Sequence, residues 1–224
     1  MPPLVRRLRD DRRGLALLEF AFTLPLALTL LLCGLETANL GLSVLRVHQI
    51  AATSADNAAR VRDSIIEADV NEVLLGGRIV GEKMDFATRG RIVLSDVLPN
   101  GNTSGSGASQ IVFQKILWQR CTGALNTTES QPKYGKEGKG VTDNTLRSMG
   151  APNRQIAATP GSAMIFAEVT YRYKPVISAK ILAPFLGDPV YLRSEASFTV
   201  RERTTEELKN PNGAVPSVCT RYDL

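Results

Sequence analysis

The amino-acid sequence predicts an α+β protein, in which a long N-terminal helix carries a membrane span and a C-terminal antiparallel β-sheet forms the head. An apolar run covers residues 15–35, a length close to the roughly 20 residues that cross a bilayer as a helix. Residues 36–75 contain no proline and are rich in alanine, which favours continuation of that helix. The rest of the chain contains four runs rich in β-branched and aromatic residues, which favour strands.

A short basic arm, residues 1–14, precedes the apolar run. The arm contains five arginines and two aspartates, so it holds +3 of the formal net charge of +5 and leaves +2 for residues 15–224. Because basic residues next to a span stay on the cytoplasmic side, the arm predicts a cytoplasmic N-terminus and export of everything after Glu36. The nearly neutral remainder gives little support to nucleic-acid binding.

These patterns predict four parts: a cytoplasmic leader (1–14), a transmembrane helix (15–35), an extracytoplasmic helix (36–76) and a β-rich head domain (77–224). Pro25 is expected to kink the span. Beyond the span, polar residues such as Arg46, Asn57 and Glu67 occupy one face, and the helix is expected to end near Gly76–Gly77. Apolar residues recur at helical spacing on the opposite face: Ala38, Leu42, Leu45, Ala52, Ala55, Ala59 and Ile66.

The predicted strands cover residues 91–98, 110–119, 163–173 and 190–200. Residues 100–107 predict a turn or flexible loop, and residues 122–161 predict a long surface excursion. Trp118 is expected in the packed core, and the acidic residues of the strands are expected to face solvent.

The three cysteines differ in their surroundings. Cys33 lies inside the apolar run, where a thiol behaves as a small hydrophobe. Cys121 and Cys219 lie in the remainder and are a candidate disulfide if that part is exported, the alternative being two reduced thiols that never meet. The sequence has no CxxC pair and only one histidine, His48, expected at a surface or interface. We therefore expect no metal site, no cofactor and no enzymatic activity.

The N-terminal segment excludes three classes of export signal. Its apolar core is longer than that of a cleaved secretory signal and has no A-x-A-like site. Leu32 stands before Cys33, where a lipoprotein signal has glycine or alanine, and the run after Arg12–Arg13 is too apolar and too long for a twin-arginine signal. A plain uncleaved signal anchor explains everything except Gly14 and Glu19.

Glu19 is an acid five residues into the apolar run. A charged group within a bilayer costs about 2.5–3.5 kcal/mol on insertion scales. Such a residue is expected to have a pairing partner in an assembled state.

This pattern of Gly14, an apolar residue and Glu19 resembles the processing site of type IV prepilins. Within that class, the chain is similar to the TadE-like family, pseudopilins associated with tight-adherence (Flp) pili. The similarity covers roughly residues 12–60, and weaker similarity extends to Phe113–Cys121 and Ala167–Val169. The exported head is larger than in short members of the family. The residues that carry the resemblance are Arg13-Gly14-Leu15-Ala16-Leu17-Leu18-Glu19-Phe20-Ala21-Phe22-Thr23-Leu24-Pro25 and Gly34-Leu35-Glu36.

The resemblance implies a membrane-anchored structural component of pilus assembly in the bacterial inner membrane, with its head in the periplasm or outside. A prepilin peptidase would cleave between Gly14 and Leu15, and Glu19 with Phe20 would dock against neighbouring subunits. The implied partners are the prepilin peptidase, other pilins or pseudopilins, the inner-membrane assembly platform and the bilayer. Two alternatives remain open: an uncleaved single-pass anchor with an extracytoplasmic binding head, and a minor pseudopilin of a secretion system.

Overall fold

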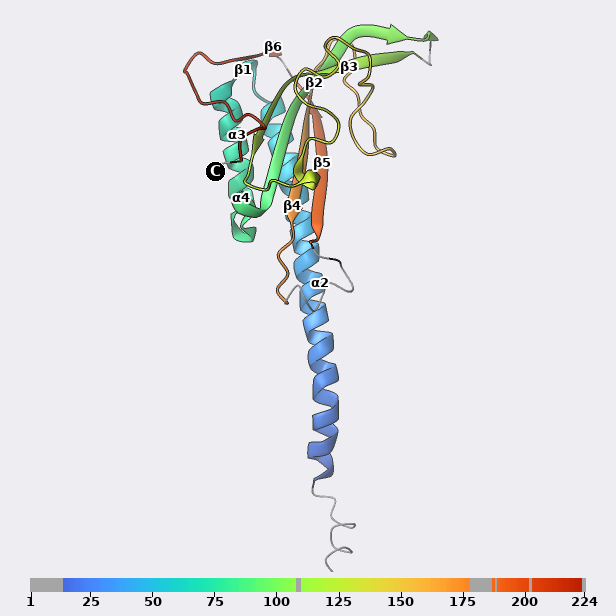
Figure 1. Ribbon diagram of the computed structural model, residues 1–224, viewed down its shortest axis with the longest axis vertical. Helices are drawn as coiled ribbons and strands as arrows, with labels where there is room; N and C mark the ends of the chain where they lie inside the picture. Colours follow the sequence, from blue (N-terminus) through green and yellow to red (C-terminus); the bar gives the residue numbers. More distant parts are fainter. Residues whose placement is uncertain (1–13, 108–109, 178–186, 188, 202, 223–224) are drawn as a thin grey trace, which may run out of the picture.

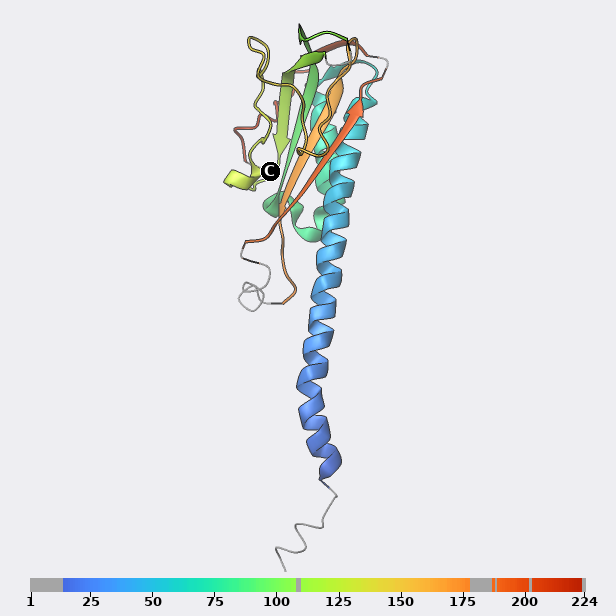
Figure 2. The same ribbon diagram turned by 90° about the vertical axis from the view of Figure 1, so that its right-hand side faces the viewer.

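The computed structural model describes residues 14–107, 110–177, 187, 189–201 and 203–222. It consists of a long helix whose upper half packs along a head domain and whose lower half extends alone below that head (Figures 1 and 2). This arrangement confirms the predicted α+β class. Of the predicted leader, only Gly14 lies within the described residues.

Helix α2 runs without interruption from Leu15 to Ala59, so it spans about 67 Å at 1.5 Å per residue. Pro25 lies inside it, and the Thr29 hydroxyl donates to the Pro25 carbonyl at 2.8 Å. In Figure 2 the helix is curved, and its lowest turns lean away from the direction of the part above. Pro25, which was expected to kink the span, does not interrupt α2.

The predicted single helix over residues 36–76 is wrong. After α2 ends, a short strand β1 (Asp63–Ile66) pairs in parallel with β6 (Arg203–Lys209), and helix α3 (Glu67–Val80) begins directly after it. Asp63, the first residue of β1, adopts a φ of 58°, and the Asp69 carboxylate accepts from the Ile66 N–H at the start of α3. The chain reverses here because a strand some 140 residues later supplies the pairing partner.

Gly76–Gly77 lies within α3 and does not end a helix. A Cβ on Gly77 would lie 2.7 Å from both Ile92 Cδ1 and Ser54 Oγ. Glycine is required at this position because α3 packs closely against α2 and the sheet. Two short helices, η1 (Glu82–Met84) and α4 (Phe86–Arg89), then lead into the sheet.

The four predicted strands are confirmed, but the first extends to Ser104, into residues that were expected to form a turn or flexible loop. The strands form one antiparallel sheet in the order β3-β2-β4-β5, with the bounds Gly90–Ser104 for β2, Ile111–Thr122 for β3, Met164–Arg172 for β4 and Tyr191–Thr199 for β5. Helices α2 and α3 cover one face, and Trp118 is buried there as expected. Because residues 36–59 and α3 share one core with the strands, the head begins at the upper half of α2.

The buried face of α2 differs from the predicted stripe. Ala55 and Ala59 are buried as expected, but Leu42 and Leu45 are 57% and 65% exposed. The α2 residues buried in the core shared with α3 and the sheet are Val47, Ile50, Ala51, Ala55, Ala58 and Ala59.

The segment between β3 and β4, expected to be a surface excursion, covers the second face of the sheet. Its Leu146, Met149 and Ala158 are buried in a second core with strand residues such as Ile116 and Phe166. It also pairs with the outer edge of β3, since the Ile116 N–H donates to the Lys139 carbonyl at 2.9 Å. A loop that supplies both apolar cover and strand partners protects an edge that solvent would otherwise reach.

The expectation that strand acids face solvent is wrong for Asp96 and Glu168, and α3 likewise buries Glu67. Arg120 donates to Glu67 Oε2 at 2.9 Å and to Glu137 Oε2 at 2.8 Å, which satisfies a charge that the helical pattern placed on the polar face. Glu168 accepts from the Lys133 N–H at 3.0 Å, while its Oε1 is buried without a partner. Burial raises the pKa of Glu168 to about 7.

The raised pKa of Glu168 makes stability depend on pH. An unfolded glutamate has a pKa of about 4.3, so between that value and the folded value the native state binds more protons. The contribution of Glu168 to the free energy of unfolding is therefore greatest at low pH and falls as the pH rises towards 7. We expect Glu168→Gln to stabilise the protein by about 2 kcal/mol more at pH 8 than at pH 5.

This prediction is checked by urea unfolding in detergent micelles, followed by the fluorescence of the single tryptophan, Trp118. Glu129→Gln is the matched control, because Glu129 also faces Arg193 but its side chain is 52% exposed. An equal change in stability at both pH values would contradict the assignment.

Candidate processing and assembly site

The predicted cleavage position lies at the exposed lower end of α2. Gly14 precedes the first residue of the helix, and its carbonyl accepts from the Leu18 N–H at 3.1 Å. Its φ of −92° is one that any residue adopts, and a Cβ placed on it would meet nothing within 4 Å. The fold of this chain therefore does not require glycine at position 14.

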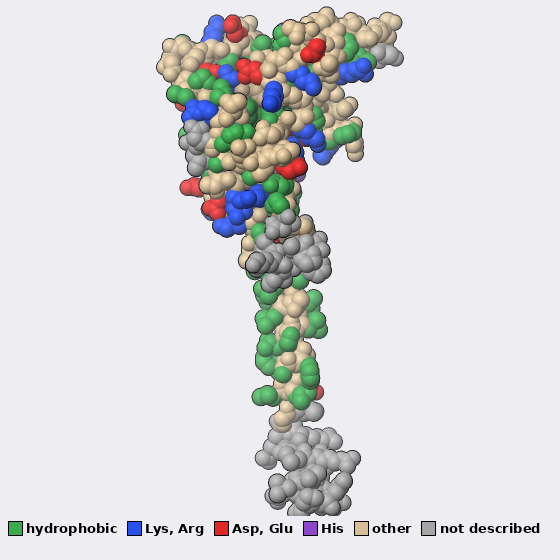
Figure 3. Space-filling view, in the orientation of Figure 1, with side chains coloured by type: hydrophobic (Ala, Val, Ile, Leu, Met, Phe, Trp, Pro, Cys, Tyr) green, Lys and Arg blue, Asp and Glu red, His purple; other side chains and the backbone are tan. Residues whose placement is uncertain are grey.

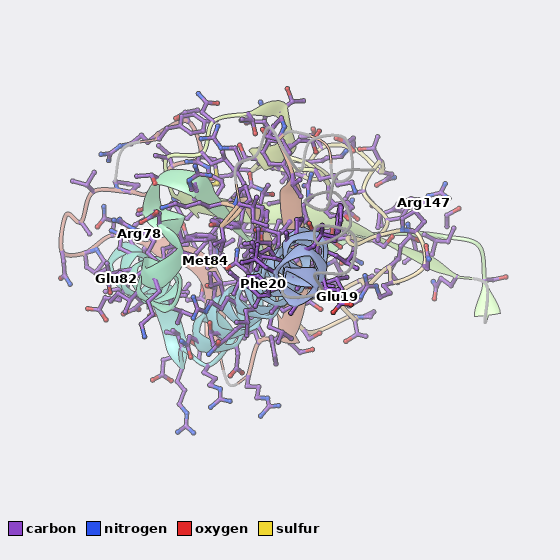
Figure 4. All side chains as sticks on the ribbon, turned by 90° about the horizontal axis from the view of Figure 1, so that it is seen from below. Glu19, Phe20, Arg78, Glu82, Met84 and Arg147 are labelled. Carbon is purple, nitrogen blue, oxygen red and sulfur yellow. A yellow bond between two sulfur atoms is a disulfide. The ribbon has the colours of Figure 1, made fainter. Side chains whose placement is uncertain are left out.

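Glu19 and Phe20 lie one turn further along the same helix. Both are exposed, Phe20 by 62%, and they point to different sides of the helix when it is viewed along its axis (Figure 4). Among the described residues, none forms a hydrogen bond or ion pair with the Glu19 side chain. Residues 15 and 19 are four apart, so they occupy the same side of α2 about 6 Å apart along its axis.

The surroundings of Glu19 are apolar on every side of the helix. Helix α2 contains a segment long and apolar enough to cross a membrane, and none of that segment is buried within the chain. Large side chains such as Leu17, Phe22 and Leu30 are each more than 60% exposed. Figure 3 shows this lower part of the helix covered by hydrophobic side chains. A surface of this kind is stable in contact with lipid or with other apolar helices.

A second acid, Glu36, marks the point where this exposed segment meets the head. Glu36 is only 3% exposed. The Tyr173 hydroxyl donates to its Oε1 at 2.6 Å, and the N–H groups of Val176 and Ile177 each donate to its Oε2 at 3.0 Å. Asn39 Nδ2 donates in turn to the Tyr173 hydroxyl at 2.7 Å. Burial, together with the hydrogen bond to Glu36, raises the pKa of Tyr173 above its ordinary value.

We refer to this arrangement of Glu36, Asn39, Tyr173, Val176 and Ile177 as the Glu36 joint. It attaches the chain that leaves β4 to the helix at the first polar residue after the apolar run. The sequence indicated Glu36 as the end of the span and as part of the motif that carries the family resemblance, but not as a buried acceptor. Its partners lie about 140 residues away, and no local pattern links them.

The two cysteines expected to pair do form a disulfide, with Cα atoms 4.7 Å apart, and Cys33 is exposed on α2. The disulfide lies in the head, far from Gly14 and Glu19, so the structure does not bring the two sets of predicted residues together. Arg91 supports the disulfide in a way the sequence did not indicate: its guanidinium donates to the carbonyls of Gly123, Cys219 and Arg221 at 2.7 Å and stacks on the Tyr222 ring.

The remaining expectations concern His48 and metal binding. His48 is exposed, and its Nδ1 lies 2.7 Å from the Ser194 hydroxyl. Over the ranges that the structure describes, no three acidic, cysteine or histidine side chains converge as metal ligands would.

Comparison with known protein families, with curated proteins and with solved structures found no match. The resemblance to TadE-like proteins therefore stays a prediction from the sequence, based chiefly on the N-terminal motif.

The Glu36 joint gives a local prediction. Glu36→Ala removes the acceptor of two backbone N–H groups and of the Tyr173 hydroxyl. Because an unsatisfied donor costs about 1–3 kcal/mol, we expect amide hydrogen exchange at Val176 and Ile177 to accelerate about tenfold. Glu82→Ala is the control, since Glu82 is an exposed acid at the same end of the head. Unchanged exchange in Glu36→Ala would contradict the role of the joint.

Proposed function

We propose that this chain is a TadE-like pseudopilin, a single-pass structural component of tight-adherence pilus assembly that a prepilin peptidase matures between Gly14 and Leu15. The observation that carries the proposal is Glu19. It is an acid on an exposed apolar helix, and no described side chain of its own molecule pairs with it. An acid in hydrocarbon is costly unless another molecule supplies the partner.

Cleavage after Gly14 would create that partner. It exposes the α-amine of Leu15, a cation at the end of the same helix. Leu15 and Glu19 are separated by one helical turn, about 6 Å. Two parallel copies displaced along the helix axis by about that distance therefore bring the amine of one subunit to the carboxylate of the next. Pairing removes both charges from the apolar environment.

The surroundings of Gly14 support access by a peptidase. The glycine is exposed, has open space around it and adopts an ordinary backbone conformation. Its small size is therefore explained by a requirement outside the chain, such as the narrow binding cleft of a protease.

The role that follows is structural. The apolar segment of α2 would hold the protein in the bacterial inner membrane with the N-terminus in the cytoplasm and the head in the periplasm. Its partners would be the prepilin peptidase, other pilins or pseudopilins and the assembly platform, and the result would be surface adhesion. The two tests below separate this proposal from an uncleaved anchor carrying a binding head and from a pseudopilin of a secretion system.

The first test addresses processing. Mass spectrometry of the protein from its native cells is expected to find an N-terminus at Leu15, and deletion of the prepilin peptidase should leave the 14-residue leader in place. Gly14→Val should also retain the leader, because the added methyl groups meet nothing in this fold but obstruct the peptidase. Gly41→Val is the control, since Gly41 has equally open surroundings on the same helix. A wild-type protein that keeps residues 1–14 would favour the uncleaved anchor.

The second test addresses assembly. We expect Glu19→Gln to be processed normally and yet to reduce sheared surface pili at least tenfold, because the neutral side chain no longer pairs with an amine. Glu207→Gln, an exposed acid of the head, makes the same change of charge and should assemble normally. Wild-type amounts of pili from Glu19→Gln would refute the docking role, and a defect confined to protein secretion would favour the secretion-system alternative.

A further inference from the structure

The hydrogen bonds of the Glu36 joint determine how far the head stands from the membrane. The Tyr173 hydroxyl bonds Glu36, and Asn39 Nδ2 donates to the Lys174 carbonyl at 3.4 Å. The end of β4 therefore lies beside the first turn of α2 after the apolar run. That run has 21 residues and a length of about 31 Å, close to the roughly 30 Å of a hydrocarbon core. When it spans the bilayer, Tyr173 and Lys174 lie at the depth of the lipid headgroups.

Four basic residues gather at this level, and we call them the basic rim: Lys83, Arg89, Arg172 and Lys174. Contacts between elements hold Arg89, Arg172 and Lys174 there. Lys174 Nζ lies 2.6 Å from Asp85 Oδ2, and Arg89 Nη1 donates to the carbonyls of Arg172 and Tyr173 at 3.4 Å. Figure 3 shows Lys and Arg side chains, with acidic side chains beside them, at the lower end of the head.

The charge of the rim is only partly compensated. Lys83, Arg172 and Lys174 are exposed, and Arg89 is half-buried. The acids beside them are Asp85 and Glu82, and Figure 4 shows Glu82 at the edge of the head away from α2. Glu36 is buried and accepts from groups inside the fold, so it does not present a charge at this surface. Four bases and two exposed acids leave a net charge of +2.

Within the described residues, the ion pair to Asp85 is the only one that any rim residue forms. The side chains of Lys83 and Arg172 are thus available to an external anion. The rim also lies on the side of the span opposite the basic leader, so it plays no part in retaining the N-terminus in the cytoplasm.

We propose that the basic rim binds the phosphate-bearing headgroups of anionic phospholipids in the leaflet from which α2 emerges. Lysine and arginine near a membrane surface attract anionic lipid, and a guanidinium can bind a phosphate through two parallel hydrogen bonds. The depth set by the Glu36 joint favours lipid phosphate over phosphate free in solution. The bound lipids hold the head against the bilayer in one orientation. This inference rests on the membrane anchoring of the proposed function, and it does not require cleavage or pilus assembly.

The test uses the full chain in lipid nanodiscs. Cys33→Ser and Thr88→Cys leave one free thiol on exposed α4, next to Arg89, for a fluorophore, while Cys121 and Cys219 stay in the disulfide. A quencher attached to lipid headgroups reports how closely α4 approaches the bilayer. We expect quenching about twofold greater in discs of equal phosphatidylglycerol and phosphatidylcholine than in phosphatidylcholine alone. The difference should disappear as salt is raised from about 0.02 M to 1 M.

Two triple variants complete the design. Lys83→Gln, Arg172→Gln and Lys174→Gln together should abolish the difference between the two lipids. The control changes the exposed Lys133, Lys136 and Lys139 of the long loop to glutamine, which removes the same net charge, and should keep the difference. Trp118 fluorescence verifies that both variants are folded.

The outcomes separate this inference from the proposed function. Protein that enters discs but shows equal quenching in both lipids overturns lipid binding and leaves anchoring intact. Loss of the difference in both triple variants also overturns the rim, because net charge alone would then explain the attraction. Protein that does not enter discs overturns both the anchoring and the rim.

Discussion

The buried carboxylate of Glu36 lies where the exposed apolar part of α2 meets the folded head. A carboxylate removed from water is strongly destabilising unless its oxygens are satisfied. Here a tyrosine hydroxyl and two backbone N–H groups satisfy them, and all three come from the chain that leaves β4. The joint therefore forms only when the head has folded against α2. It marks where the exposed part of the helix ends and holds the end of β4 beside α2. In the proposed membrane-anchored state, it would also set which residues of the head lie closest to the bilayer.

Helix α2 is continuous, but its surface differs on the two sides of that joint. Below Glu36 its apolar side chains are exposed all round, whereas above it a single face containing Val47, Ile50 and Ala55 is buried against the sheet. Acidic side chains also differ between the head and the exposed part of the helix. The head satisfies Glu67 through Arg120, but Glu19 has no partner among the described residues. This contrast between the paired Glu36 and Glu67 and the exposed Glu19 supports the proposal that other molecules complete the lower helix.

Two sets of contacts hold the C-terminal tail and the long loop of the head to its sheet. The disulfide and the three hydrogen bonds of Arg91 attach the C-terminal tail to the end of β3, and the segment between β3 and β4 covers both a face and an edge of the sheet. These attachments join segments distant in sequence. They connect the long loop and the C-terminal tail to the sheet, and the sheet itself packs on α2. This reinforcement of the head suits the structural role that we propose for the chain.

Local pattern was sufficient for the apolar span, the four strands of the sheet, the burial of Trp118 and the pairing of Cys121 with Cys219, because each depends on side-chain periodicity or on a choice between very few candidates. It was also sufficient to single out Gly14 and Glu19, which stand out against their neighbours without any tertiary contact. The end of α2 at Ala59, the close packing at Gly77 and the burial of Glu36, Glu67 and Glu168 were decided by tertiary structure. The reason is physical: a helix is interrupted when a distant strand offers pairing, and an acid is buried only when distant donors or cations satisfy it. Arg120 lies 53 residues from Glu67 and Tyr173 lies 137 from Glu36, so only the folded chain brings those partners together.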